Sequence, residues 1–402
     1  MSAELAHLKG QISLLLSSGY PGLDSASKYY LQSSGKLFRP MVVFLMARAT
    51  AAAPKMEGWK AACVALEANF NAPLAPQAVI ADRNPDLSML SSRSMPANIL
   101  GAGAGRGPPT VAVLGTQRRL AEIVELIHTA SLLHDDVVDQ AETRRGRPSA
   151  NVFGGNKLSV LAGDYMLGRA SVFLARLRQP EVIELMAEAI AELVKGELYQ
   201  LQTPCAAAGD APGSLARSLD HYLEKTYLKT ASLISKSCRA TAVLGGATDD
   251  VAAAAYSYGR HMGLAFQLID DVLDYTATSE QLGKPATADL ALGLATAPVL
   301  YAWEEFPELG PMIARRFGHD GDAAKVCCSP VLPSLLLAPS SPRCPDSWLT
   351  DECRHARWFT DPTASAALAS WPRRSAKPPA TPSASSPTPT PAPGLMRCST
   401  WS

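Results

Sequence analysis

Apolar residues recur at helical spacing along most of the first 325 residues, with little of the alternation that marks a half-buried strand. Met1 to about Pro54 is helical in pattern, with a break at 35–40 after which Pro40 is suited to begin a helix. From about 117 to 324 the helical pattern is almost continuous, with loops predicted near 145–155, 203–213 and 283–289. Segments of this length predict an all-α fold, a helical bundle around a central cavity.

Two stretches lack this periodicity. Residues 72–116 are rich in proline and contain the run Gly101–Gly107, which we interpret as a loop or insertion. A phosphate-binding loop is disfavoured there because no strand precedes the glycines and no Lys-Ser/Thr follows them. Residues 327–402 are rich in Pro, Ser and Cys, and we interpret them as a disordered tail or an artefact of gene prediction, with a docking tail as the alternative. We therefore predict one catalytic domain at 1–326.

The composition narrows the class of protein. The 402 residues carry 37 basic and 37 acidic side chains, so no basic stripe favours nucleic-acid binding, and we expect no transmembrane segment. The eight cysteines form no CxxC pair, which disfavours a zinc or disulfide framework and indicates a reducing compartment. The residues after Met1 resemble neither a secretory signal nor a transit peptide, so we expect a cytosolic protein or one whose presequence is absent from this chain.

Two acidic triplets share one spacing, i, i+1 and i+4: Asp135, Asp136 and Asp139, and Asp270, Asp271 and Asp274. On an α-helix each set spans an arc of roughly 100°, so each projects to one side. A single such triplet is ordinarily a solvated face. Here both follow long apolar runs, and because unpaired buried carboxylates are costly, their repetition indicates a shared cation. Hard cations such as Mg²⁺ take oxygen ligands and are often shared with phosphates.

Cations that could bind a diphosphate occur near both triplets. Each is an ordinary surface charge when considered alone, and only their joint spacing around the triplets favours a site. They are Lys36, Arg39, Arg144, Arg145, Lys225, Lys229 and Lys284. His128 lies almost two turns before Asp135 and would share its face, although an isolated histidine there is more often a core residue.

These motifs resemble those of the trans-isoprenyl diphosphate synthases, especially the long-chain polyprenyl diphosphate synthases of mitochondria (hexaprenyl, solanesyl and decaprenyl) that make the ubiquinone side chain. The resemblance covers about residues 4–325. It rests on Gly35-Lys36-Leu-Phe-Arg39-Pro40, Glu125-Leu-Ile-His128, His134-Asp-Asp-Val-Val-Asp139 with Arg144-Arg145-Gly146, Lys229-Thr230, Phe266-Gln267-Leu-Ile-Asp-Asp-Val-Leu-Asp274 and Gly283-Lys284-Pro285. The resemblance implies a Mg²⁺-dependent trans-prenyltransferase that adds isopentenyl diphosphate head-to-tail to an allylic diphosphate.

The resemblance also implies roles for individual residues. Isopentenyl diphosphate would be bound by Lys36, Arg39, His128 and Arg145. The allylic diphosphate would be bound by Arg144, Lys229, Thr230, Gln267 and Lys284. Mg²⁺ would be bound by Asp135, Asp139 and Asp270, while both triplets and Lys229 form the catalytic set. We further expect a homodimer or hetero-oligomer, a mitochondrial location, otherwise a cytoplasmic one, and peripheral membrane association for product release.

Product length is predicted from helix geometry. A chain growing along the helix of the first triplet first meets the residues four and five positions before Asp135, roughly 6 to 7.5 Å deeper. These are Ser131 and Ala130, whose small side chains leave the path open. We therefore predict a product longer than C20.

Two alternatives remain at this point. A class I terpene cyclase shares the first triplet but needs neither the second triplet nor an isopentenyl diphosphate site. A non-catalytic subunit of a heteromeric synthase would tend to have lost the acidic motifs, which are intact here. One departure from the family is that its final helices have no evident counterpart after about Lys325.

Overall fold

The structure is a computed structural model that describes residues 2–31, 37–76, 113–201, 214–276, 288–322 and 325–326. The chain divides into two compact units, Met1–Trp358 and Phe359–Ser402. The second unit lies wholly outside the described residues. Also outside the described residues are Lys36, Lys284, most of the predicted insertion at 72–116, the loop at 203–213, most of the loop at 283–289 and the predicted tail at 327–402.

The predicted all-α fold is confirmed. The helices are α1 (Ser2–Leu15), α2 (Pro21–Lys28), α3 (Phe38–Ala51), α4 (Trp59–Asn69), α7 (Gly115–Val138), α8 (Ala150–Gly154), α9 (Asn156–Arg176), α10 (Pro180–Leu201), α11 (Ser214–Thr226), the π-helix η3 (Tyr227–Ala231), α12 (Ser232–Leu244), α13 (Asp249–Thr276), α15 (Ala288–Ala291), α16 (Ala297–Glu305) and α17 (Leu309–Ala314). Within the described residues, the sheet content is one antiparallel hairpin of β1 (Thr143–Arg144) and β2 (Arg147–Pro148).

Several boundaries differ from the prediction. The loop predicted near 145–155 contains β2 and α8. Helix α3 begins at Phe38, so Pro40 lies inside its first turn, where its missing N–H leaves no helical hydrogen bond unmade. Helix α7 begins at Gly115, two residues before the predicted start, because Glu67 accepts hydrogen bonds from the backbone N–H groups of Gly115 and Thr116 at 2.8 and 2.7 Å. A carboxylate at this position also complements the positive end of the helix dipole.

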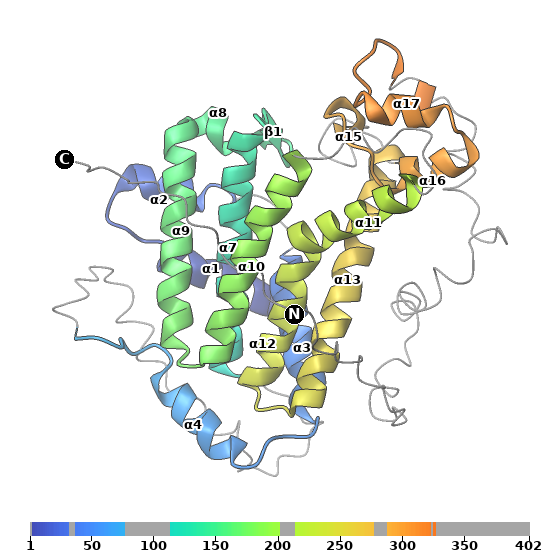
Figure 1. The fold of residues 1–402 in the computed structure, drawn as a ribbon. Helices are drawn as coiled ribbons and strands as arrows, with labels where there is room; N and C mark the ends of the chain where they lie inside the picture. The colour runs from blue at the N-terminus through green and yellow to red at the C-terminus, as the bar shows by residue number, and fades with distance from the viewer. Residues whose placement is uncertain are drawn as a thin grey trace, which may run out of the picture. The chain divides into compact units, whose positions relative to one another are not determined.

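Helix α7 lies at the centre of the bundle and packs against α3, α9 and α12, while α12 packs in turn against α10 and α13. Figure 1 shows α9, α7, α10, α12 and α13 running side by side. One face of α7 is fully buried and includes Leu120, Ile123, Leu126 and Leu133. Each such side chain contributes about 1.5 to 3 kcal/mol by its removal from water. This central packing fixes the helix that carries the first triplet.

Helix α9 is, among the described residues, long and apolar enough by length and composition to cross a membrane. Its side chains at Ala162, Met166, Ala170 and Phe173 are buried in the core, and α9 packs against α7. The core helix of a soluble protein has the same length and composition, so α9 is weak evidence for a membrane span.

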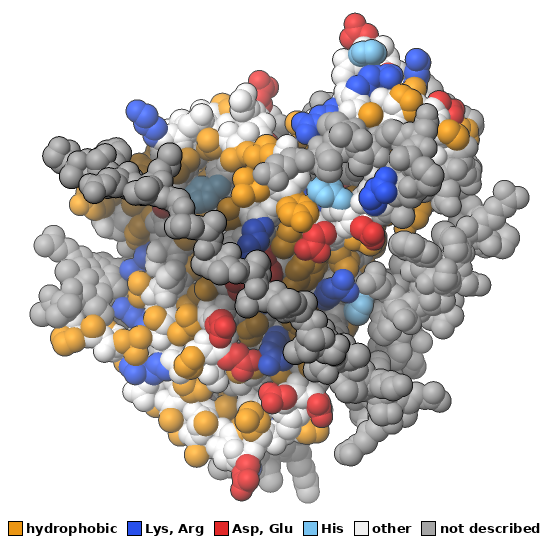
Figure 2. Space-filling view, viewed as in Figure 1, with side chains coloured by type: hydrophobic (Ala, Val, Ile, Leu, Met, Phe, Trp, Pro, Cys, Tyr) orange, Lys and Arg blue, Asp and Glu red, His pale blue; other side chains and the backbone are white. Residues whose placement is uncertain are grey.

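On the face shown in Figure 2, basic and acidic side chains are interspersed with hydrophobic ones rather than gathered in a field of one sign.

Candidate functional site

The first triplet lies at the carboxyl end of α7, and its members have different surroundings. Asp135 and Asp139 are half-buried, whereas Asp136 is completely buried. Consecutive residues on a helix point about 100° apart, so Asp136 is directed into the protein. Arg144 donates to its Oδ1 from both Nε and Nη2 at 2.6 Å, and the Tyr30 hydroxyl donates to its Oδ2. The resemblance already set Asp136 apart from the predicted metal ligands, but the sequence did not show its burial or its partners.

Asp135 and Asp139 share their surroundings with Glu197 of α10 and Lys229 of η3. The pKa of Asp135 is raised to about 7, chiefly by burial and then by the charge of Glu197, which Lys229 and Arg144 oppose. Burial also raises the pKa of Asp139. Lys229 Nζ lies 2.7 Å from Glu197 Oε1 and donates to Gln200 Oε1 at 2.9 Å. This site therefore concentrates negative charge in partly dehydrated surroundings, which an added cation would relieve.

The π-helix η3 carries Lys229 and Thr230 between α11 and α12. Such single π turns occur frequently at functional sites. The backbone packs closely on both sides: a Cβ at Gly196 of α10 would lie 2.7 Å from Lys229 Cγ, and one at Gly263 of α13 would lie 2.5 Å from Ala231 Cα. The absence of side chains at these two glycines therefore allows α10 and α13 to approach η3.

The second triplet lies near the carboxyl end of α13 and is connected to η3. Thr230 Oγ1 donates to Gln267 Oε1 at 3.0 Å, and Gln267 Nε2 donates to Asp271 Oδ1 at 2.9 Å. Asp271 also accepts a hydrogen bond from the Tyr222 hydroxyl at 2.7 Å, and burial raises the pKa of Asp271. Thr230 and Gln267, both predicted to bind the allylic diphosphate, are thus in contact.

The other two aspartates of the second triplet differ in exposure. Asp274 is completely buried and accepts the backbone N–H of Asp289 at 3.3 Å, whereas Asp270 is exposed. Asp270 is also the member predicted to bind the metal, and its exposure leaves it accessible to an ion.

The predicted isopentenyl diphosphate residues are partly brought together. Arg39 Nη1 lies 2.8 Å from His128 Nε2, and because arginine can only donate, His128 accepts and is neutral. Burial and the charges of Arg39, Arg145 and Arg144 lower the pKa of His128 well below its ordinary value. Burial also lowers the pKa of Arg39 to about 10, which leaves it a cation at neutral pH. Lys36, the fourth predicted residue, lies outside the described residues.

Two residues beside the predicted site were not selected from the sequence as ligands. Glu125 is buried one turn before His128 on α7, and burial raises its pKa to about 7 although Arg39 and Arg145 oppose the shift. Glu197, described above, lies on the amphipathic helix α10, where a glutamate gives no special signal in the sequence.

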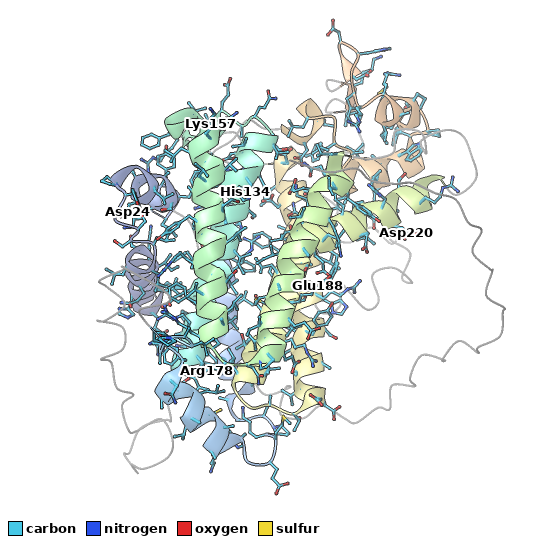
Figure 3. The ribbon with its side chains drawn as sticks, turned by 60° about the vertical axis from the view of Figure 1, so that its left-hand side comes forward. Asp24, His134, Lys157, Arg178, Glu188 and Asp220 are labelled. Atoms are coloured by element: carbon cyan, nitrogen blue, oxygen red, sulfur yellow. The ribbon has the colours of Figure 1, made fainter. Side chains whose placement is uncertain are left out.

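His134 lies where α7 runs beside α9, and Figure 3 labels it. Its Nε2 is 3.4 Å from Asp164 Oδ1 and 3.3 Å from Val160 O.

The two residues predicted to control product length are placed differently. Ala130 is fully buried in the main hydrophobic core, while Ser131 is half-buried and donates to His128 O at 2.9 Å. A larger side chain is therefore easier to accommodate at Ser131 than at Ala130.

The carboxylates do not converge into a preformed metal cluster. Among the described residues, no three His, Cys, Asp or Glu side chains gather closely enough to hold an ion. The donor chemistry nevertheless fits a hard cation, since Asp135, Asp139 and Asp270 offer carboxylate oxygens. The pKa values of Asp135 and Asp139 are raised because the nearby positive charges do not offset the effect of burial. An ion shared with a diphosphate would complete such a site.

The family model described as polyprenyl synthetase matches residues 99–328, which is more than half of the chain. The chain belongs to the polyprenyl synthetase family. The matched region includes both triplets, Arg144, Arg145, η3 and Gln267. The sequence prediction of a prenyltransferase of this family is thereby confirmed.

Curated relatives of this family member extend over most of its length. The probable hexaprenyl pyrophosphate synthase, mitochondrial, of Neurospora crassa is 53% identical over 325 residues, which cover 81% of this chain and 69% of that protein. The hexaprenyl pyrophosphate synthase, mitochondrial, of Saccharomyces cerevisiae is 40% identical over 375 residues, covering 81% and 78%. The decaprenyl-diphosphate synthase subunit 1 of Schizosaccharomyces pombe is 46% identical over 322 residues, covering 79% and 75%. The chain is a long-chain polyprenyl diphosphate synthase, as its sequence predicted.

Solved structures support the same fold. A polyprenyl synthase from Caulobacter crescentus, crystallised with calcium and isoprenyl diphosphate, matches with a TM-score of 0.63 and 27% identity over 93% of this chain and 90% of that one. A decaprenyl diphosphate synthase from Rhodobacter capsulatus matches with a TM-score of 0.60 and 26% identity, covering 91% and 93%.

Proposed function

We propose that this synthase extends an allylic diphosphate by repeated head-to-tail addition of isopentenyl diphosphate and supplies the all-trans side chain of ubiquinone. The observation that carries the proposal is the cluster of Asp135, Asp139, Glu197 and Lys229, in which acidic and basic groups meet in partly dehydrated surroundings beside η3. Relatives named hexaprenyl and decaprenyl synthases support a product of long-chain length.

Asp135, Asp139 and Asp270 would hold Mg²⁺, whose oxygen preference their carboxylates match. When bound, the metal supplies electrostatic stabilisation of the departing diphosphate. Calcium in the Caulobacter crescentus enzyme supports a divalent cation in this family. Mg²⁺ fits this site because it binds through one or two carboxylates together with substrate phosphates, and no all-protein cage is gathered among the described residues.

The residues of the chain bind and orient the two substrates. Arg144 and Lys229 would contact the allylic diphosphate, and Lys229 would then exchange part of its contact with Glu197 and Gln200 for phosphate oxygens. Arg39 and His128 would bind the diphosphate of isopentenyl diphosphate. The C1–O bond of the allylic substrate breaks and diphosphate leaves with its electron pair, the π electrons of the isopentenyl double bond form the new bond to C1, and the resulting cation loses a proton to the released diphosphate. Positive groups already in place stabilise the negative charge that develops on the departing diphosphate and so lower the activation free energy.

We further propose a mitochondrial location and an oligomeric enzyme. Two of the relatives described above are named as mitochondrial proteins, and the Schizosaccharomyces pombe relative is named as a subunit. That name also raises the alternative of a subunit that depends on a partner for activity. Turnover by the purified chain alone would exclude this alternative.

The proposal is tested by removing one predicted metal ligand from each triplet. Asp135→Ala and Asp270→Ala should each lower incorporation of labelled isopentenyl diphosphate by about 10²- to 10³-fold, because each removes charge stabilisation from the leaving group. Chelation of the metal should abolish incorporation reversibly. The matched control is Glu188→Ala, an exposed acid on α10 that Figure 3 labels and whose pair with Lys195 spans 3.5 Å. Turnover within tenfold of the native enzyme in both triplet variants would contradict the proposal.

A further inference from the structure

The Asp136 carboxylate is enclosed by donors from two other segments of the chain. Its side chain has no exposed surface. Oδ1 accepts two hydrogen bonds from Arg144, each 2.6 Å long, and Oδ2 accepts one from the hydroxyl of Tyr30. Tyr30 follows α2 and lies 106 positions before Asp136. A charged carboxylate with two charge-assisted bonds and a hydroxyl donor is well compensated in the interior.

Tyr30 and its neighbour Tyr29 also hold the hairpin that carries Arg144. The Tyr30 hydroxyl accepts the backbone N–H of Ala150 at 2.8 Å, at the start of α8 just after the hairpin. The Tyr29 hydroxyl donates to Pro148 O at 2.8 Å, and the Arg147 guanidinium lies 5.2 Å from the centre of the Tyr29 ring. Strand β2 and the start of α8 are therefore tied to the segment after α2.

These contacts leave Asp136 poorly suited to binding a metal. An ion at either oxygen would have to displace donors from Arg144 or Tyr30 and would leave the half-buried Arg144 guanidinium or the buried Tyr30 hydroxyl without its acceptor. The loss of a buried partner of this kind costs several kcal/mol. Asp135 and Asp139 are half-buried and lie beside Glu197 and Lys229 instead. The two roles, binding an ion and holding an arginine, are thus divided within one triplet.

We propose that Asp136 and Tyr30 are positioning residues that fix Arg144 for the allylic diphosphate. The inference rests on the proposed function of Arg144 as an allylic diphosphate ligand. The guanidinium is planar, so bonds from Nε and Nη2 to one carboxylate fix the orientation of the whole group. The same carboxylate, through Tyr30 and Ala150, connects that orientation to the position of the hairpin.

The test measures binding of farnesyl diphosphate by calorimetry with Mg²⁺ present and isopentenyl diphosphate absent, so that no turnover occurs. Asp136→Asn should weaken binding by about tenfold, the value of one charge-assisted hydrogen bond of about 1.4 kcal/mol. Tyr30→Phe keeps the ring and removes only the hydroxyl, so it should also weaken farnesyl diphosphate binding, but by less than Asp136→Asn. It replaces Asp136→Asn in the test if that variant does not fold. The Mg²⁺ concentration for half-maximal farnesyl diphosphate binding should stay within twofold in both variants, whereas Asp135→Asn should raise it.

A double-mutant cycle separates positioning from a general loss of stability. If Asp136 acts through Arg144, the variant carrying both Asp136→Asn and Arg144→Gln should bind no more weakly than Arg144→Gln alone. The matched control is Glu67→Gln, a buried carboxylate that caps the opposite end of α7 and should lower the melting temperature without changing farnesyl diphosphate affinity.

Two results would overturn the inference in an active enzyme. The first is an increase in the Mg²⁺ concentration for half-maximal binding in Asp136→Asn as large as that in Asp135→Asn. The second is a double variant whose loss of farnesyl diphosphate affinity equals the product of the losses in the two single variants. Failure of the proposed function would be seen differently, as a folded native chain that neither binds farnesyl diphosphate nor incorporates isopentenyl diphosphate.

Discussion

At the scale of single residues, burial separates the aspartates that hold protein groups from those open to substrate. Asp136 accepts from Tyr30 and Arg144, and Asp271 accepts from Tyr222 and Gln267. Asp270 is exposed. The i, i+1, i+4 spacing could be read from the sequence because it is local. The partners could not, since tyrosines 106 and 49 positions away give no signal until the chain is folded.

Glu125 gives a prediction about stability and pH. Burial raises its pKa from an ordinary value of 4.5 to about 7. Between these values the folded protein holds a proton that the unfolded chain releases, so the stability contributed by this group falls as the pH rises from about 4.5 to about 7. Glu125→Gln removes this dependence. Relative to the native protein, the variant should therefore gain on the order of 3 kcal/mol of unfolding free energy across that window.

This prediction is checked by urea denaturation of both proteins at pH 5 and pH 8. The control is Glu188→Gln, which alters an exposed ion pair with Lys195 on α10, and its stability should follow the native pH dependence. Parallel pH dependences for Glu125→Gln and the native protein would show that Glu125 is ionised in the fold at both values.

At the scale of elements, the π-helix η3 is the feature that helical periodicity did not predict. The sequence predicted an almost continuous helical pattern from about 117 to 324, in which Lys225 and Lys229, four residues apart, would share one face of an ordinary α-helix. In the structure, Lys225 lies in α11 before the turn at Tyr227–Ala231, 5.3 Å from the centre of the Tyr222 ring, while Lys229 lies within that turn and contacts Glu197. Periodicity cannot detect this change because a π turn preserves the apolar pattern on either side and depends on tertiary packing.

That packing is tested at the glycine that faces η3. Gly196→Ala would place a Cβ 2.7 Å from Lys229 Cγ and 3.0 Å from its backbone nitrogen, so η3 would have to move. Overpacking of this kind costs about 1 to 3 kcal/mol, and the displaced Lys229 should raise the KM for the allylic substrate several-fold. Gly168→Ala on α9 is the control, because its Cβ would meet no atom within 4 Å and it should stabilise the helix slightly. Equal melting temperatures and KM values in the two variants would contradict this account of η3.

At the scale of the whole molecule, the all-α bundle could be predicted because apolar periodicity over long segments reports directly which helix faces are buried. The short helices α4, α16 and α17 were not predicted individually, since few turns give little periodic signal. The site was predicted as motifs in sequence order, and the structure brings Arg39 to His128 and Thr230 to Gln267. Glu197 was missed because its role depends on α10 packing against η3.

The central claim, that this chain alone makes a prenyl diphosphate longer than C20, is tested most directly by measuring product length. Purified protein is incubated with Mg²⁺, farnesyl diphosphate and labelled isopentenyl diphosphate, and the hydrolysed products are separated by length. We predict products beyond C20, and shorter ones from Ser131→Phe, which places an aromatic ring on the half-buried face of α7 below Asp135. Products that end at C15 or C20 in the native protein, or no incorporation by folded protein, would contradict the claim.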